Sequence, residues 1–151
     1  MLFYLLVIGI VILDRLSKIL AVKYLEPIGS FPLIQDIFHL TFAKNDGAAF
    51  SILSNKQLFL IIVTVIVICF ILGLLYRNIA MGGSPWFSLA LSLIAGGAIG
   101  NWIDRILYNY VIDYFEFRFI NFAFFNVADV FIVCGTALMC YLVLFKNLEL
   151  K

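Results

Sequence analysis

The sequence predicts an all-α polytopic membrane protein with about four transmembrane helices and a small β-stranded element. Of its 151 residues, 65% are hydrophobic and 13% are charged, and the mean hydropathy is +1.13. Soluble proteins are about half apolar and about a quarter charged, so this composition indicates an integral membrane protein. The length suits one domain, residues 1–151, and roughly 20 apolar residues per span leave room for about four helices.

Several classes of site find no support in the composition. A net charge of +1 gives no indication that the protein binds nucleic acid. The lone His39 has no Cys or His neighbour, so we expect neither a metal site nor a cofactor. The cysteines lie in apolar runs without the spacing of metal ligands, and we expect small buried hydrophobic residues at Cys69, Cys134 and Cys140.

Four apolar runs account for the expected helices, at residues 2–22, 57–76, 86–107 and 126–145. The first run has neither the basic start nor the cleavage site of a signal peptide, so we expect it to be a retained span. Within it, Asp14 and Lys18 are four residues apart and share one face of a helix. We therefore expect an ion pair near the membrane interface, with the lysine stem reaching outward, and such a pair could also position a functional site.

Two stretches with a period of two predict short amphipathic strands at residues 37–42 and 113–122. Each carries apolar residues on one face and polar residues on the other. The apolar positions are Phe38, Leu40 and Phe42 in the first stretch and Phe115, Phe117 and Phe119 in the second. The intervening polar positions are His39, Thr41, Glu116 and Arg118.

A turn signal follows the first of these strands, in the sequence Asn45-Asp46-Gly47-Ala48-Ala49-Phe50. Asn, Asp and Gly tolerate positive φ, so one interpretation is a simple hairpin turn. In a second interpretation, the small residues from Gly47 onward let a substrate backbone come close while the Asn45 amide hydrogen-bonds to it.

The third span contains polar residues that packing does not explain. Gly96 and Gly100 form a G-x-x-x-G pair, which permits close approach between membrane helices. Asn101 and Arg105 follow directly, four residues apart on one face. Because polar and ionisable side chains at membrane depth are costly, we treat both as functional candidates. Asp104 is expected to be an interfacial charge partner.

Two further aspartates flank the predicted fourth span and the strand before it. Asn126 is a candidate N-cap, and Asp129 lies in the first turn, where the helix dipole favours an anion. Ordinary capping could explain that pair. Together with Asp113, however, these residues place two carboxylates next to an apolar span, and we interpret them as the groups that cleave a peptide bond.

Taken in chain order, these polar blocks resemble the conserved blocks of the lipoprotein signal peptidases, the signal peptidase II family. The matching blocks are Asp14 with Lys18, Asn45-x-Gly47-Ala48-Ala49-Phe50, Gly100-Asn101 with Arg105, Asp113, and Asn126-Val127-Ala128-Asp129. The resemblance implies an aspartic endopeptidase that removes the signal peptide from diacylglyceryl-modified prolipoproteins, cutting just before the lipid-bearing cysteine. It assigns catalysis to Asp113 and Asp129. Substrate binding or support is implied for Asp14, Lys18, Asn45, Gly47, Gly100, Asn101, Arg105, Asn126 and Ala128.

The resemblance also implies a cellular setting and partners. It implies a multi-pass protein of the bacterial cytoplasmic (inner) membrane, with cytoplasmic termini, an extracytoplasmic β-stranded element and an active site near the outer face. Counting Lys and Arg leans slightly toward the opposite orientation. The implied partners are the diacylglyceryl-prolipoprotein and membrane lipid, with cyclic peptides of the globomycin type as inhibitors.

An acid pair is chemically consistent with these residues. Two neighbouring carboxylates do not ionise together easily, so one can polarise a carbonyl while the other takes a proton from water. No Ser-x-x-Lys stretch is present for serine chemistry. A small transporter or proton-coupled membrane protein is the alternative, since polar residues also line such pathways, although the sequence has no internal repeat. A structural assembly factor is a third possibility.

Overall fold

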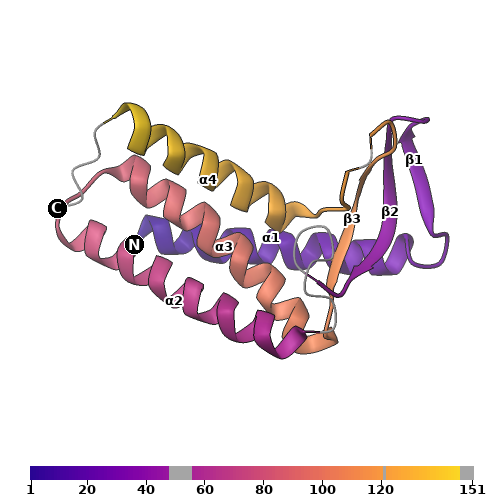
Figure 1. The fold of residues 1–151 in the computed structure, drawn as a ribbon, viewed down its shortest axis with the longest axis horizontal. Helices are drawn as coiled ribbons and strands as arrows, with labels where there is room; N and C mark the ends of the chain where they lie inside the picture. The colour runs from indigo at the N-terminus through magenta and orange to yellow at the C-terminus, as the bar shows by residue number, and fades with distance from the viewer. Residues whose placement is uncertain (48–55, 121, 147–151) are drawn as a thin grey trace.

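The described part of the chain forms an elongated bundle of four helices, and a small sheet lies at one end of it (Figure 1). The structure is a computed structural model that describes residues 1–47, 56–120 and 122–146. The helices are α1 (Leu2–Tyr24), α2 (Gln57–Ala80), α3 (Pro85–Tyr108) and α4 (Val127–Phe145). The strands are β1 (Ser30–Ile34), β2 (Phe38–Asn45) and β3 (Val111–Phe117). The start of α1 and the end of α4 lie at the end of the bundle opposite the sheet (Figure 1).

Three of the described helices, α2, α3 and α4, are long and apolar enough to cross a membrane. The expectation of about four spans is therefore met only in part. Helix α1 has a comparable length, 23 residues, but its apolar run is interrupted by Asp14, Arg15 and Lys18. The small β-stranded element is present as a sheet of three strands.

The outer surface of the bundle is apolar, as expected for contact with lipid rather than water. Large side chains such as Phe70 on α2 and Leu144 on α4 are 66% and 70% exposed. The prediction that the three cysteines are buried is wrong, because all three are exposed: Cys69, Cys134 and Cys140. In a membrane protein an apolar run does not imply burial within the protein, since lipid also solvates its outward-facing side chains.

Glycines on α3 bring the neighbouring helices close, as the G-x-x-x-G pair predicted. A Cβ atom at Gly96 would lie 2.8 Å from Ile10 of α1, and one at Gly100 would lie 2.4 Å from Asp14 Oδ2. On the side facing α4, a Cβ atom at Gly97 would lie 2.3 Å from the Ala128 carbonyl oxygen. Helix α3 therefore packs tightly between α1 and α4, and this places its polar residues against both.

The sheet is antiparallel in the order β1, β2, β3, with a register irregularity between Leu40 and Ala43. Strand β1 was not predicted from the sequence. Pro32 is accommodated because β1 is an edge strand, where a missing N–H costs little. Strand β3 begins two residues before the predicted start and ends at Phe117, so the predicted strand at residues 113–122 was too long.

The alternation of the two sheet faces is confirmed. On one face, the Phe38 ring lies 5.8 Å from the Phe115 ring between centroids. On the other, the Thr41 hydroxyl donates to Glu116 Oε2 at 2.5 Å and lies 2.7 Å from the Ser30 hydroxyl. The sheet thus presents an aromatic face and a polar face.

Candidate active site

Asn126 and Asp129 form the start of helix α4 and hold each other in place. Asn126 Oδ1 accepts a hydrogen bond from the Asp129 backbone N–H at 3.0 Å, and Asp129 Oδ2 accepts one from the Asn126 backbone N–H at 3.1 Å. This reciprocal capping box satisfies two backbone donors that the helix itself cannot pair. The capping interpretation is confirmed, and the cap still leaves the Asn126 amide nitrogen free to make other contacts.

That amide nitrogen connects the two aspartates. Asn126 Nδ2 donates to Asp113 Oδ1 at 2.6 Å, so one asparagine contacts the carboxylate of β3 and caps the helix that carries Asp129. Asn45 Nδ2, from the end of β2, donates to Asp113 Oδ2 at 2.9 Å. Asn101 Nδ2, from α3, donates to Asp129 Oδ1 at 2.7 Å. Each carboxylate therefore receives hydrogen bonds on both oxygens.

A fully buried lysine fixes the orientation of the Asn101 amide. Lys18 Nζ donates to Asn101 Oδ1 at 2.9 Å, and Asn126 Nδ2 donates to the same oxygen at 3.0 Å. With its oxygen occupied by two donors, Asn101 must present its nitrogen to Asp129. The prediction that the Lys18 stem reaches outward is therefore wrong, because its side chain is 0% exposed and points into the bundle.

Two acids surround that lysine. Lys18 Nζ lies 2.9 Å from Asp14 Oδ2, which confirms the expected ion pair, and 2.9 Å from Asp104 Oδ2. Asp104 also pairs with Arg15. It is thus a charge partner as predicted, and its side chain is fully buried within the protein. Its position at the membrane interface stays a prediction. The cations of Arg15 and Lys18 thus meet the carboxylates of Asp14 and Asp104 in the bundle. This pairing offsets the cost of burying each charge.

The small residues at this junction have specific contacts. Ala128, which is fully buried in the first turn of α4, donates its backbone N–H to Asp14 Oδ1 at 3.1 Å. Gly100 leaves room for the other oxygen of that carboxylate. Asp14 and Lys18 consequently tie α1 to the polar residues of α3 and α4.

The turn after β2 belongs to the same assembly. Asn45 Oδ1 accepts from the Gly47 backbone N–H at 3.0 Å, which confirms a turn. Arg105 Nη2 donates to the Gly47 carbonyl at 3.1 Å. The same side chain also donates from Nδ2 to Asp113, and the interpretation in which the Asn45 amide binds a substrate backbone stays a prediction. The other residues of that sequence block, Ala48, Ala49 and Phe50, lie outside the described residues.

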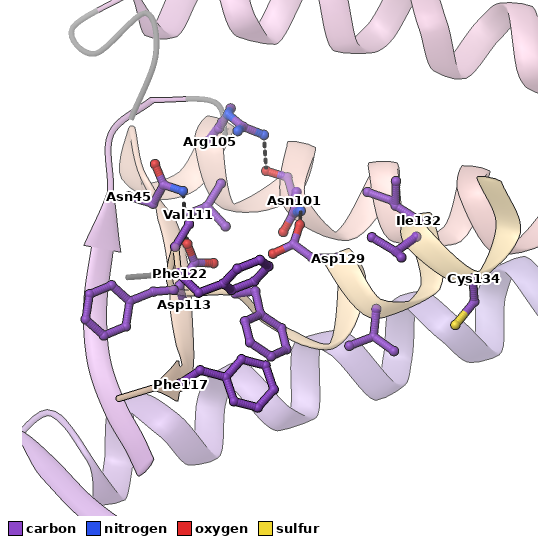
Figure 2. A pocket seen from close by; sticks show the side chains of 15 residues that line it. Asn45, Asn101, Arg105, Val111, Asp113, Phe117, Phe122, Asp129, Ile132 and Cys134 are labelled. Atoms are coloured by element: carbon purple, nitrogen blue, oxygen red, sulfur yellow. Dashed lines mark hydrogen bonds between the residues drawn. The ribbon is translucent and has the colours of Figure 1, made fainter. Parts of the chain in front are cut away.

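A cavity of about 500 Å³ opens beside the two aspartates. Figure 2 shows Asn45, Asn101 and Arg105 on its polar side. The remaining wall is apolar and comes from the segment around β3 and from α4: Val111, Phe117, Phe122, Ala123, Phe124, Phe125, Val130, Ile132, Val133 and Cys134. Sequence reasoning missed this wall, because aromatic residues that line a cavity look the same in a sequence as those that face lipid.

The environment of Asp113 favours its protonated form. Burial raises the pKa of Asp113, and the nearby charge of Asp129 raises it further, to about 7, against the opposing hydrogen bonds from Asn45 and Asn126. Asp113 is 1% exposed, whereas Asp129 is partly exposed to the cavity. The two acids therefore differ in environment, and such a difference separates the roles of a general acid and a general base.

Tyr114 is another residue that sequence reasoning missed. Its hydroxyl donates to Ser17 Oγ at 2.7 Å and accepts from the Val127 backbone N–H at 3.3 Å, so it joins α1 to the start of α4. Burial raises the pKa of Tyr114 to about 12, which keeps the hydroxyl neutral. Within the described ranges, no group of three or more His, Cys, Asp or Glu side chains is placed to hold a metal ion.

Comparison with known proteins identifies the family. Residues 6–145 match the family Peptidase_A8, described as signal peptidase (SPase) II. The lipoprotein signal peptidase of Caldanaerobacter subterraneus subsp. tengcongensis is 48% identical over 138 residues, covering 91% of this chain and 92% of that protein. The lipoprotein signal peptidase of Clostridioides difficile is 43% identical over 145 residues, covering 96% of each chain.

A solved structure described as a bacterial membrane enzyme has a TM-score of 0.82 at 31% identity, and the match covers 99% of this chain and 90% of that one. A second structure with the same description has a TM-score of 0.80 at 32% identity, covering 95% and 93% of the two chains. Both the sequence and the arrangement of helices and sheet therefore agree with one family. This chain belongs to the signal peptidase II family of membrane peptidases, which process lipoproteins.

Proposed function

We propose that this protein is an aspartic endopeptidase that removes the signal peptide from diacylglyceryl-modified prolipoproteins, cutting just before the lipid-bearing cysteine. The observation that carries the proposal is the pairing of Asp113 and Asp129 through Asn126 at the wall of one apolar cavity. A substrate of this class has an apolar signal peptide and acyl chains, which suit the aromatic and aliphatic wall. The family relationship supports a peptidase rather than a transporter.

In this proposal Asp113 enters the reaction protonated and Asp129 enters it ionised. The Asp129 carboxylate takes a proton from a water molecule while the water oxygen attacks the scissile carbonyl carbon. The Asp113 hydroxyl donates to the carbonyl oxygen as negative charge develops there. When the C–N bond breaks, the leaving nitrogen receives a proton from the acid pair. The products are a signal peptide with a new carboxylate and a lipoprotein with a new amino terminus.

Arg105 is proposed to hold the substrate backbone. It lines the cavity, and its Nε is buried without a hydrogen-bond partner among the residues that the structure describes. An unpaired buried donor is costly, so a substrate carbonyl that reached it would be bound favourably. Cyclic peptides of the globomycin type are proposed to occupy the same cavity and compete with the substrate.

Helix α1 is proposed to be a fourth span, in a single membrane-embedded domain of residues 1–151. Its charges Asp14 and Lys18 are fully buried, while its outward face carries exposed apolar residues: Leu5, Ile8, Ile12, Leu16 and Ile19. Lipid would therefore meet a hydrocarbon surface along α1 as it does along the other helices. We place the protein in the bacterial inner membrane with cytoplasmic termini, which puts the sheet and the active site at the outer face.

The proposal is tested with purified protein and a lipid-modified prolipoprotein, with the unmodified precursor as the comparison substrate. Asp113→Asn and Asp129→Asn should each lower cleavage by roughly a hundred- to ten-thousandfold, the range expected for loss of a general acid or base. Chelators and serine-directed reagents should leave the parental activity intact.

Asp36→Asn is the matched control for these variants. Asp36 is exposed on a turn with φ of 60°, a conformation that asparagine also tolerates, so this change should leave cleavage unaltered. Parental turnover by either Asp113→Asn or Asp129→Asn would refute the acid pair. Loss of activity in a chelator, restored by added metal, would refute the metal-free mechanism.

A further inference from the structure

The turn after β2 is held from α2 as well as from α3. Gln57, the first residue of α2, donates from Nε2 to the Asp46 carbonyl. Arg105 of α3 donates to the next carbonyl, that of Gly47, at 3.1 Å. Two consecutive carbonyls of the turn are therefore fixed by side chains from two different helices.

This double attachment determines what Asn45 presents to Asp113. An asparagine amide can turn either its oxygen or its nitrogen toward a neighbour. In this turn Asn45 Oδ1 accepts from the Gly47 backbone N–H at 3.0 Å, which leaves Nδ2 to donate to Asp113 Oδ2 at 2.9 Å. If the turn opened, the amide would lose the contact that sets its orientation.

We propose that Gln57 is a positioning residue of this peptidase, and that its hydrogen bond to the Asp46 carbonyl holds the turn that directs the Asn45 amide nitrogen at Asp113. The proposal rests on the proposed function, in which Asp113 is one of the two acids. Gln57 itself does not line the cavity beside those acids. Its effect would be transmitted through the turn and through Asn45.

The expected signature is a change in pH dependence. Among charged groups, Asp113 senses Asp129 of α4, Lys18 of α1 and Arg105 of α3, and it also accepts hydrogen bonds from Asn45 and Asn126. The Asn45 hydrogen bond favours the ionised carboxylate, so losing it raises the pKa of Asp113. Because the proposed reaction needs Asp113 protonated, the fall of activity at high pH should then move to higher pH.

The test compares Gln57→Met, Asn45→Gly and the double variant across a pH series with lipid-modified prolipoprotein. Methionine keeps the length of the side chain but cannot donate. We expect Gln57→Met to lower kcat/KM about tenfold, which is the scale of one net hydrogen bond. We also expect the basic limb of its pH profile, the fall of activity at high pH, to move to higher pH. If Gln57 acts through Asn45, the double variant should be no worse than Asn45→Gly alone.

Asn78→Leu is the matched control, because it removes an amide at the opposite end of α2. Asn78 Nδ2 donates to the Ser84 carbonyl at 2.9 Å and to Ser88 Oγ at 2.8 Å, far along the helix from the turn. Its loss should lower the melting temperature without moving the basic limb. Gln57→Leu serves as a second variant without a donor if the methionine variant is poorly produced.

Two results would overturn the proposal. One is parental activity with an unmoved basic limb in the Gln57 variants. The other is a double variant whose loss of kcat/KM equals the product of the losses in Gln57→Met and Asn45→Gly. Such independent effects would exclude transmission through the turn. Either result combined with inactive Asp113→Asn would refute only the role of Gln57, whereas an active Asp113→Asn would refute the proposed function itself.

Discussion

Replacing Asn126 with serine would separate its two roles. Serine retains an oxygen that can cap α4, so the start of the helix should persist. It loses the amide nitrogen that donates to Asp113 Oδ1 at 2.6 Å and to Asn101 Oδ1 at 3.0 Å. We therefore expect a protein that inserts and folds normally but aligns its two acids poorly.

The size of the effect follows from the two hydrogen bonds that are lost. A hydrogen bond between uncharged groups contributes about 0.5–1.5 kcal/mol net, and each 1.4 kcal/mol or so corresponds to about a factor of ten. Cleavage of lipid-modified prolipoprotein should thus fall roughly ten- to a hundredfold. Because the lost donor favours ionised Asp113, the pKa of that group should rise, and the basic limb of the pH profile should move upward.

The control is a helix cap outside the site. Ser84 caps α3 by accepting from the Phe87 backbone N–H at 3.4 Å, so Ser84→Ala removes a cap and no contact with the acids. It should cost about 1 kcal/mol of stability and leave cleavage unchanged. Parental cleavage by Asn126→Ser, with its pH profile unmoved, would show that the reasoning about the amide nitrogen is wrong.

Three further predictions follow from the surrounding contacts. Arg105→Lys should lower activity about tenfold, because one ammonium cannot span both the Gly47 and Asn101 carbonyls. Arg118→Lys, at an exposed residue directly after β3, is the control, and equal activity of the two variants would contradict this prediction. Lys18→Met should cost about 3–5 kcal/mol of stability, since it leaves Asp14 and Asp104 buried with one cation fewer, and an unchanged melting temperature in detergent would refute the buried pairing. A reporter fused after Lys151 should be cytoplasmic and one inserted near Gly29 external, and the reverse pattern would place the site on the wrong side of the membrane.

The sequence predicted the helices well because apolar runs define them. The run at residues 57–76 became α2, Gln57–Ala80, and the run at 86–107 became α3, Pro85–Tyr108. It also placed Asn101 and Arg105 on one face, and the structure brings both to the cavity. These successes share one cause: a polar residue inside an apolar span stands out because few positions tolerate it.

The predictions that failed concern the direction in which a side chain points and the distant residues that it contacts. Helical periodicity specifies neither. Helical spacing correctly paired Asp14 with Lys18, but it could not tell whether the pair faced lipid or the bundle. The Lys18 side chain points into the bundle because Asp104 and Asn101, more than eighty residues away in the chain, are its other partners. A single polar residue at the start of an apolar run, such as Gln57, carried no signal that it contacts a turn eleven residues earlier.

The buried ion cluster has a consequence for how the chain enters the membrane. Helix α1 brings two cations and one acid to the cluster, Arg15, Lys18 and Asp14, and the balancing acid Asp104 belongs to α3. Until α3 has been synthesised, α1 therefore carries one excess positive charge, and a single lysine or arginine at the centre of a span costs about 2.5–3.5 kcal/mol. As the proposed fourth span, α1 is expected to remain close to the translocation machinery until α3 arrives and to enter lipid completely only then.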